Sequence, residues 1–493
     1  MFARFNQKAV VAVIFVFLLA IIVVVLLAEQ KHLSGSNDKK CHEIIVDPRR
    51  KLKIYEFNAP IIEEEPCPAS WVLTADDSFN ANAVVPGDNF GSVAVDPASG
   101  KIIVAGQGWN VYKFNQDGTL DSAFGVGGLL NSSVAGFTAP DSPYVQEVDG
   151  WYQILIDGDY FYLVGNPVEN LASLTRMMVQ KRNLADGTLD LTFGSGGYWA
   201  QTGSFDSEGF SVALNAAGEV FVGGHDRFVS NVNIHSVAKL SPSGILDLSF
   251  GNNGFARLHT TPSTDPEGET RGVFIQNDGK IVIAGTFFLF NTTGDIGLGV
   301  ARFNQDGTLD TSYGENNGWS WYNPVPGFDI FAYDASFRNG DVYVSGHSDG
   351  TVPANGFFNV VIKFDSDGIR DSNWANNGAQ RFAINGGNNN FEIAESIQLT
   401  CDGGCFVCGL AEMGIDPGGG PVEGFIYKLD DQGQLDTDFA ASGIFRAGAE
   451  TSYDQMTIFN NGSTYEIYAV GKGPVGNGTF GVITKFVFPN AAF

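Results

Sequence analysis

The chain has 493 residues, including 62 glycines and 40 phenylalanines, and only 17% of its residues are charged. Glycine-rich turns and aromatic strands of this kind are typical of an all-β protein, and the length is ample for a large core. The formal net charge of −27 excludes nucleic acid as a partner, because phosphate binding needs a basic surface.

A polar tail over residues 1–8 precedes twenty apolar residues without a charge, Ala9–Ala28. This length predicts a helix that crosses a bilayer once. Cleavage as a signal peptide is disfavoured, because Leu26-Leu27-Ala28 is a poor cleavage site. We therefore expect a transmembrane anchor over residues 9–28, with the acidic remainder of the chain on the extracytoplasmic side.

Residues 29–70 are interpreted as a stalk. It begins with charged residues and ends near Cys67, which has proline on both sides and is therefore disfavoured in a helix. Cys41 and Cys67 could pair within the stalk or link neighbouring chains. Apolar Ile61-Ile62 and Trp71-Val72-Leu73 are expected to dock on the domain that starts at about Trp71.

An internal repeat dominates residues 71–493. Each copy reads as a short strand, a turn with glycine, and then Asp-x-x-aromatic. The aspartates are 45 to 69 residues apart, which is the period of a propeller blade. They are Asp76, Asp121, Asp190, Asp247, Asp310, Asp371 and Asp436.

A second element alternates with the first, namely a turn followed by an apolar strand that ends in glycine. Its best copy is Asp278–Gly285, and seven copies occur. The last repeat strand ends the chain and lacks its Asp turn, and the missing half stands near Asp76. We therefore predict an all-β, seven-bladed β-propeller that the N-terminal and C-terminal strands close together, so that no sheet edge stays exposed.

The repeat resembles the bacterial delta-60 repeat family through the elements DG-x-LD-x-x-FG and DGKIV-x-AG. Asn115–Gly128 and Asp278–Gly285 carry the resemblance best, and it covers roughly residues 71–493. Copies five and six depart from it, with Ala375 and Ala440 where glycine is usual and Arg370 in place of leucine. The resemblance implies a β-propeller-like protein, often secreted or at the surface, and it implies no activity.

A basic residue recurs at one position of the first strand in all seven copies. These residues are Lys113, Lys181, Lys239, Arg302, Lys363, Lys428 and Lys485. Since the basic and Asp sets have equal membership, we expect one structural ion pair per blade, which specifies register more than it adds stability. The alternative is a ring of cations that lines a central channel and binds an anion.

The spacing of Cys401, Cys405 and Cys408 matches that of an iron–sulfur motif. However, Cys405 and Cys408 fall on a predicted strand and would point to opposite faces, so the three sulfurs cannot converge on a cluster. A Cys401–Cys405 disulfide across the turn, or buried thiols, is the favoured interpretation. Because the chain has five cysteines, one is left over or intermolecular.

No cofactor and no metal site is predicted. The segment Asp365-x-Asp367-Gly368-x-x-Asp371 is similar to part of a calcium loop, and so is Asn115-x-Asp117-Gly118-x-x-Asp121. The equivalent Ser241-x-Ser243-Gly244-x-x-Asp247 lacks the carboxylates that a hard cation needs, so turn chemistry is the favoured explanation and calcium at one or two blades is the minor alternative. His225 and His347 both follow the glycine of the second element, and a metal between them is a remote alternative. No nucleophile elbow, P-loop or dinucleotide motif is present, and we predict no catalytic residues.

The sequence thus predicts a single-pass membrane protein whose propeller binds protein partners or sister subunits, or forms part of a surface assembly. One version is a structural subunit of a virion or filament. The alternative from another class is a propeller enzyme that acts on surface glycans. An acid pair and aromatic side chains clustered at the channel would favour that alternative.

Overall fold

The computed structural model describes residues 41–43, 55–57, 67–68, 71–139, 151–227, 232–258, 267–289, 295–325, 327–349, 358–384, 391–412, 421–440, 442–475 and 478–489. The chain forms two units, Met1–Glu65 and Pro66–Phe493. Within the first, β1 (Cys41–Glu43) pairs antiparallel with β2 (Tyr55–Phe57).

The predicted anchor over residues 9–28 lies outside the described residues, and so does most of the predicted stalk. Among the residues that are described, no helix has the length and apolar character needed to cross a bilayer.

The second unit is built from four-stranded antiparallel sheets, as the all-β prediction required. The first four sheets consist of β4 (Phe90–Val95), β5 (Ile102–Gly106), β6 (Asn110–Phe114) and β7 (Leu129–Asn131); β9 (Trp151–Asp157), β10 (Tyr160–Gly165), β13 (Met178–Asn183) and β14 (Tyr198–Ala200); β15 (Ser207–Leu214), β16 (Val220–Asp226), β17 (Ile234–Leu240) and β18 (Phe255–Arg257); and β19 (Glu267–Ile275), β20 (Ile281–Phe288), β21 (Ile296–Phe303) and β22 (Trp319–Tyr322).

Three more four-stranded sheets follow. They consist of β23 (Asp329–Arg338), β24 (Asp341–Asp349), β25 (Phe358–Phe364) and β26 (Ala379–Phe382); β27 (Glu392–Leu399), β28 (Cys405–Glu412), β29 (Val422–Leu429) and β30 (Ile444–Ala449); and β31 (Ser452–Asn460), β32 (Thr464–Val475), β33 (Gly478–Pro489) and β3 (Val84–Pro86). A small accessory sheet joins β8 (Phe137–Thr138), β11 (Val168–Glu169) and β12 (Leu174–Thr175).

The last sheet combines both ends of this unit, because β3 pairs with β33. Just before β3 lies the six-residue helix α2 (Asp77–Asn82), which is capped by Asp76, whose carboxylate accepts a hydrogen bond from the amide of Phe79 at 3.1 Å. The Lys485 ammonium lies 3.6 Å from the Asp76 carboxylate, and the Asp76 amide donates to the Lys485 carbonyl at 3.0 Å.

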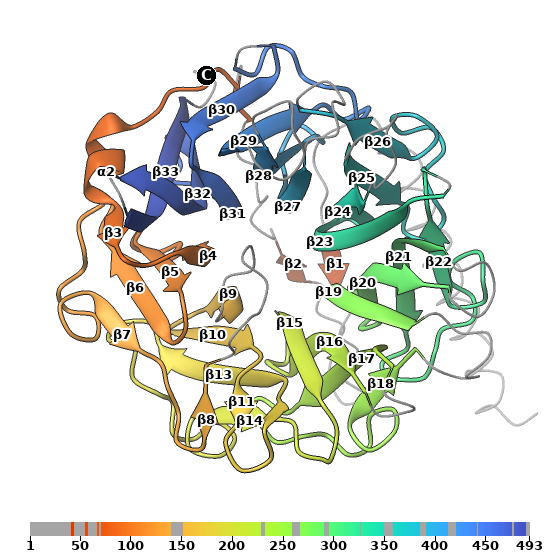
Figure 1. Cartoon of the computed structure of the whole chain (residues 1–493). Helices are drawn as coiled ribbons and strands as arrows, with labels where there is room; N and C mark the ends of the chain where they lie inside the picture. The colour runs from red at the N-terminus through yellow and green to blue at the C-terminus, as the bar shows by residue number, and fades with distance from the viewer. Residues whose placement is uncertain are drawn as a thin grey trace, which may run out of the picture. The chain divides into compact units, whose positions relative to one another are not determined.

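The first strand of each sheet contacts the first strand of the next, and Figure 1 shows these strands innermost in the second unit. The contacts run through β4, β9, β15, β19, β23, β27 and β31, and β31 contacts β4 in turn. Short connections between sheets that are adjacent in the chain explain this order.

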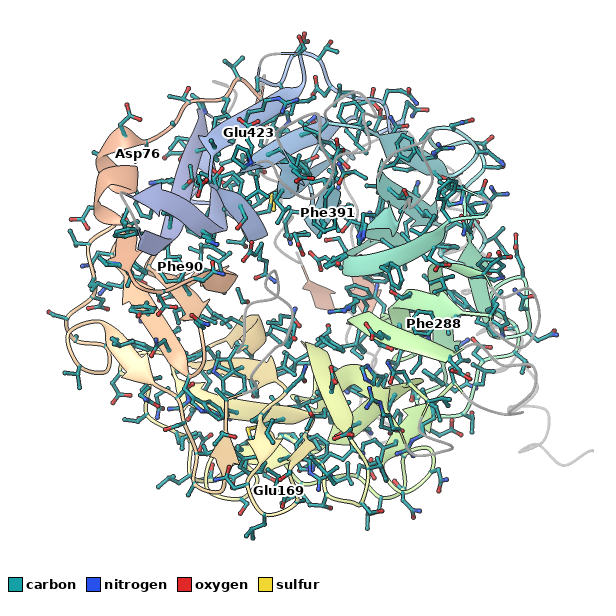
Figure 2. All side chains as sticks on the ribbon, in the orientation of Figure 1. Asp76, Phe90, Glu169, Phe288, Phe391 and Glu423 are labelled. Carbon is teal, nitrogen blue, oxygen red and sulfur yellow. A yellow bond between two sulfur atoms is a disulfide. The ribbon has the colours of Figure 1, made fainter. Side chains whose placement is uncertain are left out.

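The core is divided among the interfaces between neighbouring sheets, and side chains fill these spaces (Figure 2). The aromatic residue of every Asp-x-x-aromatic element is buried in one of them. These residues are Phe79, Phe124, Phe193, Phe250, Tyr313, Trp374 and Phe439. The repeat therefore encodes the packing between sheets as well as the turns within them.

Five turn glycines of the repeat pack against the aromatic residue of the preceding sheet, namely Gly187, Gly244, Gly307, Gly368 and Gly433. A Cβ atom on Gly368 would lie 2.4 Å from the ring of Tyr313, and one on Gly433 would lie 2.5 Å from Trp374. The same turns accept hydrogen bonds from the preceding sheet, such as Gly314 N to Asp367 O at 2.8 Å. A glycine is thus required both by its positive φ and by this close approach.

Ala375 and Ala440 adopt the left-handed backbone that glycine supplies in the other copies. Their φ angles are 49° and 48°, whereas φ is 54° at Gly125 and 55° at Gly194. Alanine in this region is strained by about 1–2 kcal/mol. We expect Ala375→Gly and Ala440→Gly each to raise the free energy of unfolding by about 0.5 kcal/mol, after the extra chain entropy of glycine is subtracted. Urea unfolding measures this change.

The matched control for this prediction is Ala94→Gly, in the interior of β4. Here no positive φ is relieved, so the substitution should lower stability by roughly 0.5–1 kcal/mol. Loss of stability in all three variants would contradict the idea that these two alanines are strained.

Candidate functional site

The ion pairs that recur in the repeat are contacts within the chain. Six of the seven predicted basic residues lie within 4 Å of the predicted aspartate. The pairs are Lys181–Asp190 (3.0 Å), Lys239–Asp247 (3.2 Å), Arg302–Asp310 (2.8 Å), Lys363–Asp371 (2.9 Å), Lys428–Asp436 (2.8 Å) and Lys485–Asp76 (3.6 Å). The structure therefore brings the basic and Asp sets together sheet by sheet.

The first sheet departs from this pattern. Lys113 donates to the carbonyl of Leu184 at 2.6 Å, while Asp121 pairs with Lys101 at 2.8 Å. Burial lowers the pKa of Lys113, although Asp121 and Asp96 oppose this effect. In this sheet, therefore, the Lys113 ammonium bonds to a backbone carbonyl, and Lys101 takes its place as the ion-pair partner of Asp121.

Several of these basic residues also form an ion pair with a second carboxylate. Lys428, whose side chain is 2% exposed, lies 2.8 Å from both Asp402 and Asp436. Burial alone would raise the pKa of Asp310, but hydrogen bonds from Lys280, Ser312 and Arg302 hold it well below its usual range. Groups engaged in this way have a structural role, and none of the seven basic residues lines the central cavity described below.

The cysteines pair differently from either arrangement expected. Cys67 and Cys401 form a disulfide with their Cα atoms 5.7 Å apart. The predicted Cys401–Cys405 bond is wrong, and so is the Cys41–Cys67 pairing, because Cys67 belongs to the second unit and lies beside the turn before β28. Cys405 and Cys408 are buried free thiols, which was the other alternative.

The expected docking of Trp71 occurs beside this disulfide. Its ring packs against Phe406, Tyr465 and Phe488 with centroid distances of 5.1–5.6 Å. Its indole N–H donates to Asp402 at 2.7 Å. The segment from Cys67 to β3 is therefore attached to the sixth and seventh sheets at several points.

The segment that is similar to a calcium loop behaves as a turn. The Asp365 carboxylate accepts from the amides of Asp367 and Ile369 at 3.0 and 2.9 Å. Among the described residues, no group of three His, Cys, Asp or Glu side chains is arranged to hold a metal. Burial lowers the pKa of both His225 and His347 to about 4.

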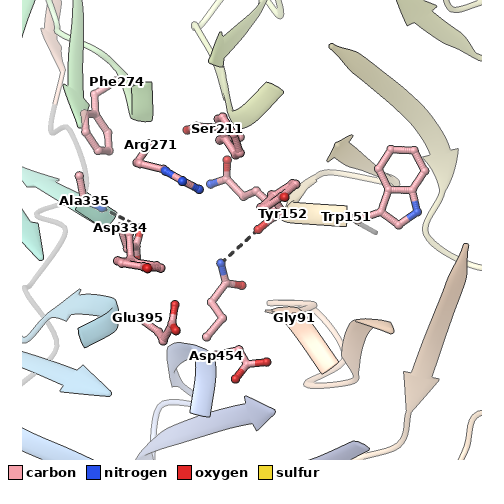
Figure 3. A pocket seen from close by; sticks show the side chains of 14 residues that line it. Gly91, Trp151, Tyr152, Ser211, Arg271, Phe274, Asp334, Ala335, Glu395 and Asp454 are labelled. Carbon is pink, nitrogen blue, oxygen red and sulfur yellow. Dashed lines mark hydrogen bonds between the residues drawn. The ribbon is translucent and has the colours of Figure 1, made fainter. Parts of the chain in front are cut away.

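A cavity of about 120 Å³ opens where the first strands meet, and every one of the seven sheets contributes to its lining (Figure 3). The sequence did not indicate this site. Its walls combine aromatic rings, amides and charged groups, which is the mixture expected of a site for a small polar ligand.

A β-bulge at an equivalent position in each first strand creates this lining. The register of pairing skips one residue in every case, and the skipped residues are Gly91, Tyr152, Phe210, Arg271, Tyr333, Glu395 and Asp454. All seven line the cavity. Bulges re-aim side chains out of the regular alternation, and they are frequent next to binding sites.

The residue after five of the seven bulges connects neighbouring sheets. Its side chain accepts a hydrogen bond from a backbone amide of the adjacent first strand. The contacts seen are Ile154 N to Ser92 (3.1 Å), Val212 N to Gln153 (2.6 Å), Val273 N to Ser211 (3.0 Å), Ile397 N to Asp334 (3.0 Å) and Val93 N to Gln455 (2.8 Å). These contacts hold the bulges at a fixed separation, so the cavity is preorganised.

The two halves of the cavity differ in chemistry. On one side, the rings of Tyr152 and Phe210 meet at 4.8 Å, and the Arg271 guanidinium lies 4.2 Å from the Phe210 centroid. Arg271 also forms an ion pair with Glu269 at 2.8 Å. The other side carries the carboxylates of Asp334, Glu395 and Asp454, from three consecutive first strands.

Burial sets the protonation of two of these carboxylates. It raises the pKa of Asp334 to about 6, and hydrogen bonds from Ile397, Ser396 and Ala335 only partly oppose it. It raises the pKa of Asp454 to about 7 against the opposing effects of Ser452 and Lys472. In the folded protein, ionisation of either carboxylate at neutral pH therefore costs free energy.

Asp454→Asn is expected to raise the free energy of unfolding by about 2 kcal/mol at pH 8 and to leave it nearly unchanged at pH 4. Because the folded pKa exceeds the unfolded one, the stability from protonated Asp454 is fully present below about pH 4 and is lost as the pH rises through about 7. The amide does not titrate. Urea unfolding at both pH values measures the difference, and equal effects at the two values would contradict it.

The sequence signal for the cavity was weak because the bulged residues share no residue type. Their distance from the glycine of the second element also varies, from 13 residues for Tyr152 to 17 for Asp454. A repeat search finds positions that stay the same, whereas this site uses the position that changes from sheet to sheet.

Comparisons with known proteins agree with the class of fold. A family model described as "Domain of unknown function (DUF5122) beta-propeller" matches residues 98–124 and 276–313. No curated protein matches the chain. The matched repeats and the four-stranded sheets define an all-β, β-propeller-type repeat protein.

Three solved structures are similar at low identity. The RRP9 WD40 repeats share 10% identity with a TM-score of 0.44, covering 84% of this chain and 99% of that one. An unknown function protein from Dyadobacter fermentans DSM 18053 shares 8% at 0.36, covering 86% and 100%. The polysaccharide lyase Uly1 shares 9% at 0.32, covering 73% and 94%. The resemblance to delta-60 repeats stays a prediction.

Proposed function

We propose that this chain is a membrane-anchored, extracytoplasmic β-propeller that acts by binding or as a structural component of a surface assembly. The proposal includes seven blades closed by the pairing of β3 with β33, and an anchor over the apolar residues 9–28. The seven four-stranded sheets, and the contact of β31 with β4, support the closed ring.

One observation carries the binding role. The identical residues of the repeat are used in ion pairs and packing inside the chain, whereas the seven bulged residues differ from one another and line one cavity. A contact that stabilises every blade recurs with the same residue types, whereas a ligand is bound by different side chains from different blades. A β-propeller supplies a rigid frame on which such a site is held.

The experiment uses the full-length chain, extracted from its native membranes in mild detergent. We expect it to fractionate with membranes and to elute as a complex larger than its own 52.8 kDa plus detergent. A photo-crosslinker at Leu248, which is 68% exposed, should then capture a protein neighbour. A chain that is recovered alone and without membranes would contradict the proposal.

A second candidate function is supported by the content of the cavity. The carboxylates of Glu395 and Asp454 share it with the rings of Tyr152, Phe210 and Tyr333, which is the combination that a glycan-acting enzyme would require. The test is release of reducing sugars from surface polysaccharides by the full-length protein, with Glu395→Gln as the inactive control. Absence of product with every polysaccharide tried would favour the binding role.

A further inference from the structure

A second cavity, of about 800 Å³, is lined by the last strands of the second and third sheets, β14 and β18. Figure 1 shows both strands on the outside of the second unit, away from the central cavity. The accessory sheet adds Phe137 and Glu169 to its wall. In the described part of the second unit this three-stranded sheet has no counterpart beside the other sheets, so the repeat does not account for the cavity.

Gln201 lines this cavity and has a side-chain amide without a partner. The residue is 3% exposed, and within the described chain neither its amide nitrogen nor its amide oxygen makes a hydrogen bond. A buried polar group of this kind lowers stability, and native proteins contain few of them. No hydrogen bond has to break for the amide to turn toward a ligand. A partner supplied by another molecule would therefore remove an existing cost.

Equivalent positions in the neighbouring sheets are occupied differently. The backbone amides of Ser132, Gln201 and Leu258 each donate to the carbonyl of the residue four positions before the repeated basic residue of their sheet. The Ser132 hydroxyl donates to the carbonyl of Trp109 and accepts from the indole of Trp151, both at 2.7 Å. Leu258 is apolar and buried. Packing alone is thus served by a satisfied hydroxyl or a hydrocarbon, and an unbonded amide is not required there.

The charged side chains of this cavity are paired within the chain. Glu169 lies 2.6 Å from the guanidinium of Arg176, and Arg257 lies 2.8 Å from Asp226. Among the described residues, no other Asp, Glu, Lys or Arg lines the cavity. A charged ligand would have to compete with one of these ion pairs, so the lining favours an uncharged ligand.

Aromatic rings supply much of the remaining wall. Trp199 is half-buried and lies two residues before Gln201, so strand alternation places both side chains on the same face of the second sheet. The ring of Phe255, from the third sheet, is 6.2 Å from that of Trp199, and Tyr198 meets Phe137 edge-on at 6.0 Å. An aromatic face is electrostatically negative and suits the C–H groups of a sugar ring.

We propose that this cavity binds an uncharged carbohydrate, with a pyranose ring against Trp199 and two neighbouring hydroxyls hydrogen-bonded to the Gln201 amide. A hydroxyl both donates and accepts, so two of them satisfy the NH₂ and the C=O of one amide, whereas an apolar ligand would leave both unbonded. The volume of about 800 Å³ is typical of a ligand site. The sugar belongs either to a free saccharide or to a glycan of a surface partner. The site is separate from the central cavity and does not depend on the proposed function.

Binding is measured on the full-length protein in detergent, first on an array of neutral, sialylated and sulfated glycans. We expect neutral glycans to be bound and added charge to bring no gain. Calorimetry with methyl glycosides of glucose, galactose and mannose, and with neutral oligosaccharides from the array, then distinguishes the sources. Binding of a methyl glycoside identifies a free sugar as a sufficient ligand, and binding of oligosaccharides alone identifies a stretch of glycan. Either result supports the proposal.

Two substitutions test the residues that carry the inference. Gln201→Met keeps the length of the side chain and removes the amide, so it should weaken binding about tenfold. Because the amide is unbonded in the free chain, this variant should not have a lower melting temperature than the wild type. Trp199→Leu keeps an apolar side chain against Phe255 and removes the ring, and it should also weaken binding at least about tenfold. Gln432→Met, at an exposed glutamine of the sixth sheet, is the matched control and should leave affinity unchanged.

The proposal is overturned if no neutral glycan binds, if only sialylated or sulfated glycans bind, or if Gln201→Met binds as tightly as the wild type. A clear loss of stability in Gln201→Met would show that the amide has a structural partner and would also contradict it. Thermal unfolding checks that each variant is folded, and Gln201→Met decides the matter where Trp199→Leu is not tolerated. A protein partner that co-purifies when no sugar binds would refute this inference alone and leave the proposed function standing.

Discussion

Gly368→Ala is expected to lower the free energy of unfolding by about 3 kcal/mol or more. Two costs add together. The residue has a φ of +76°, which strains an L-amino acid, and the new methyl group would lie 2.4 Å from the Tyr313 ring in the neighbouring sheet. Tyr313 is fully buried and cannot move without disturbing the core between the two sheets.

The matched control is Gly462→Ala. Gly462 has a similar φ of +85°, but nothing lies within 4 Å of the position that its Cβ would take. This substitution should cost only the backbone strain, about 1 kcal/mol. Urea unfolding of the two variants isolates the cost of the contact between sheets. Equal losses would show that the turn glycines serve the turns alone.

Removal of the Cys67–Cys401 disulfide is the second large effect expected. The bond joins residues 334 apart, so it closes a very long loop in the unfolded chain. Cys67→Ser with Cys401→Ser should lower the free energy of unfolding by about 2–4 kcal/mol. Trp71 and its hydrogen bond to Asp402 remain, so the segment before β3 should stay attached in the native state.

Reductant provides the internal control for this prediction. Wild-type protein should lose the same stability when reduced, while the double variant should not respond. Cys405 and Cys408 do not interfere, because burial raises the pKa of the Cys405 thiol to about 12 and that of Cys408 well above its usual value. A double variant as stable as the oxidised wild type would show that the remaining contacts of this segment suffice.

The two cysteine predictions failed for a common reason. Sequence reasoning paired cysteines that are near in the chain, Cys401 with Cys405 and Cys41 with Cys67. The observed bond joins Cys67 to a turn of the sixth sheet. Only the arrangement of the sheets brings these two segments together, and loop length by itself excludes few pairings.

The candidate site was missed for a different reason. The basic and Asp residues were found because they recur, and recurrence marks the contacts that every blade needs. The bulged residues from Gly91 to Asp454 vary in type and offset, and a bulge leaves no fixed signature in one sequence. Their convergence became visible only from the register of pairing in all seven sheets.

The sequence by itself determined the β-structure, the positions of the turns and the residues that fill each interface, because the aromatic and glycine positions are local features repeated along the chain. The tertiary structure alone decided that Gly368 contacts Tyr313, that Cys67 meets Cys401, and that seven dissimilar side chains share one cavity. Each of these facts joins residues from different sheets, and such contacts depend on how strands pair and pack rather than on any local pattern.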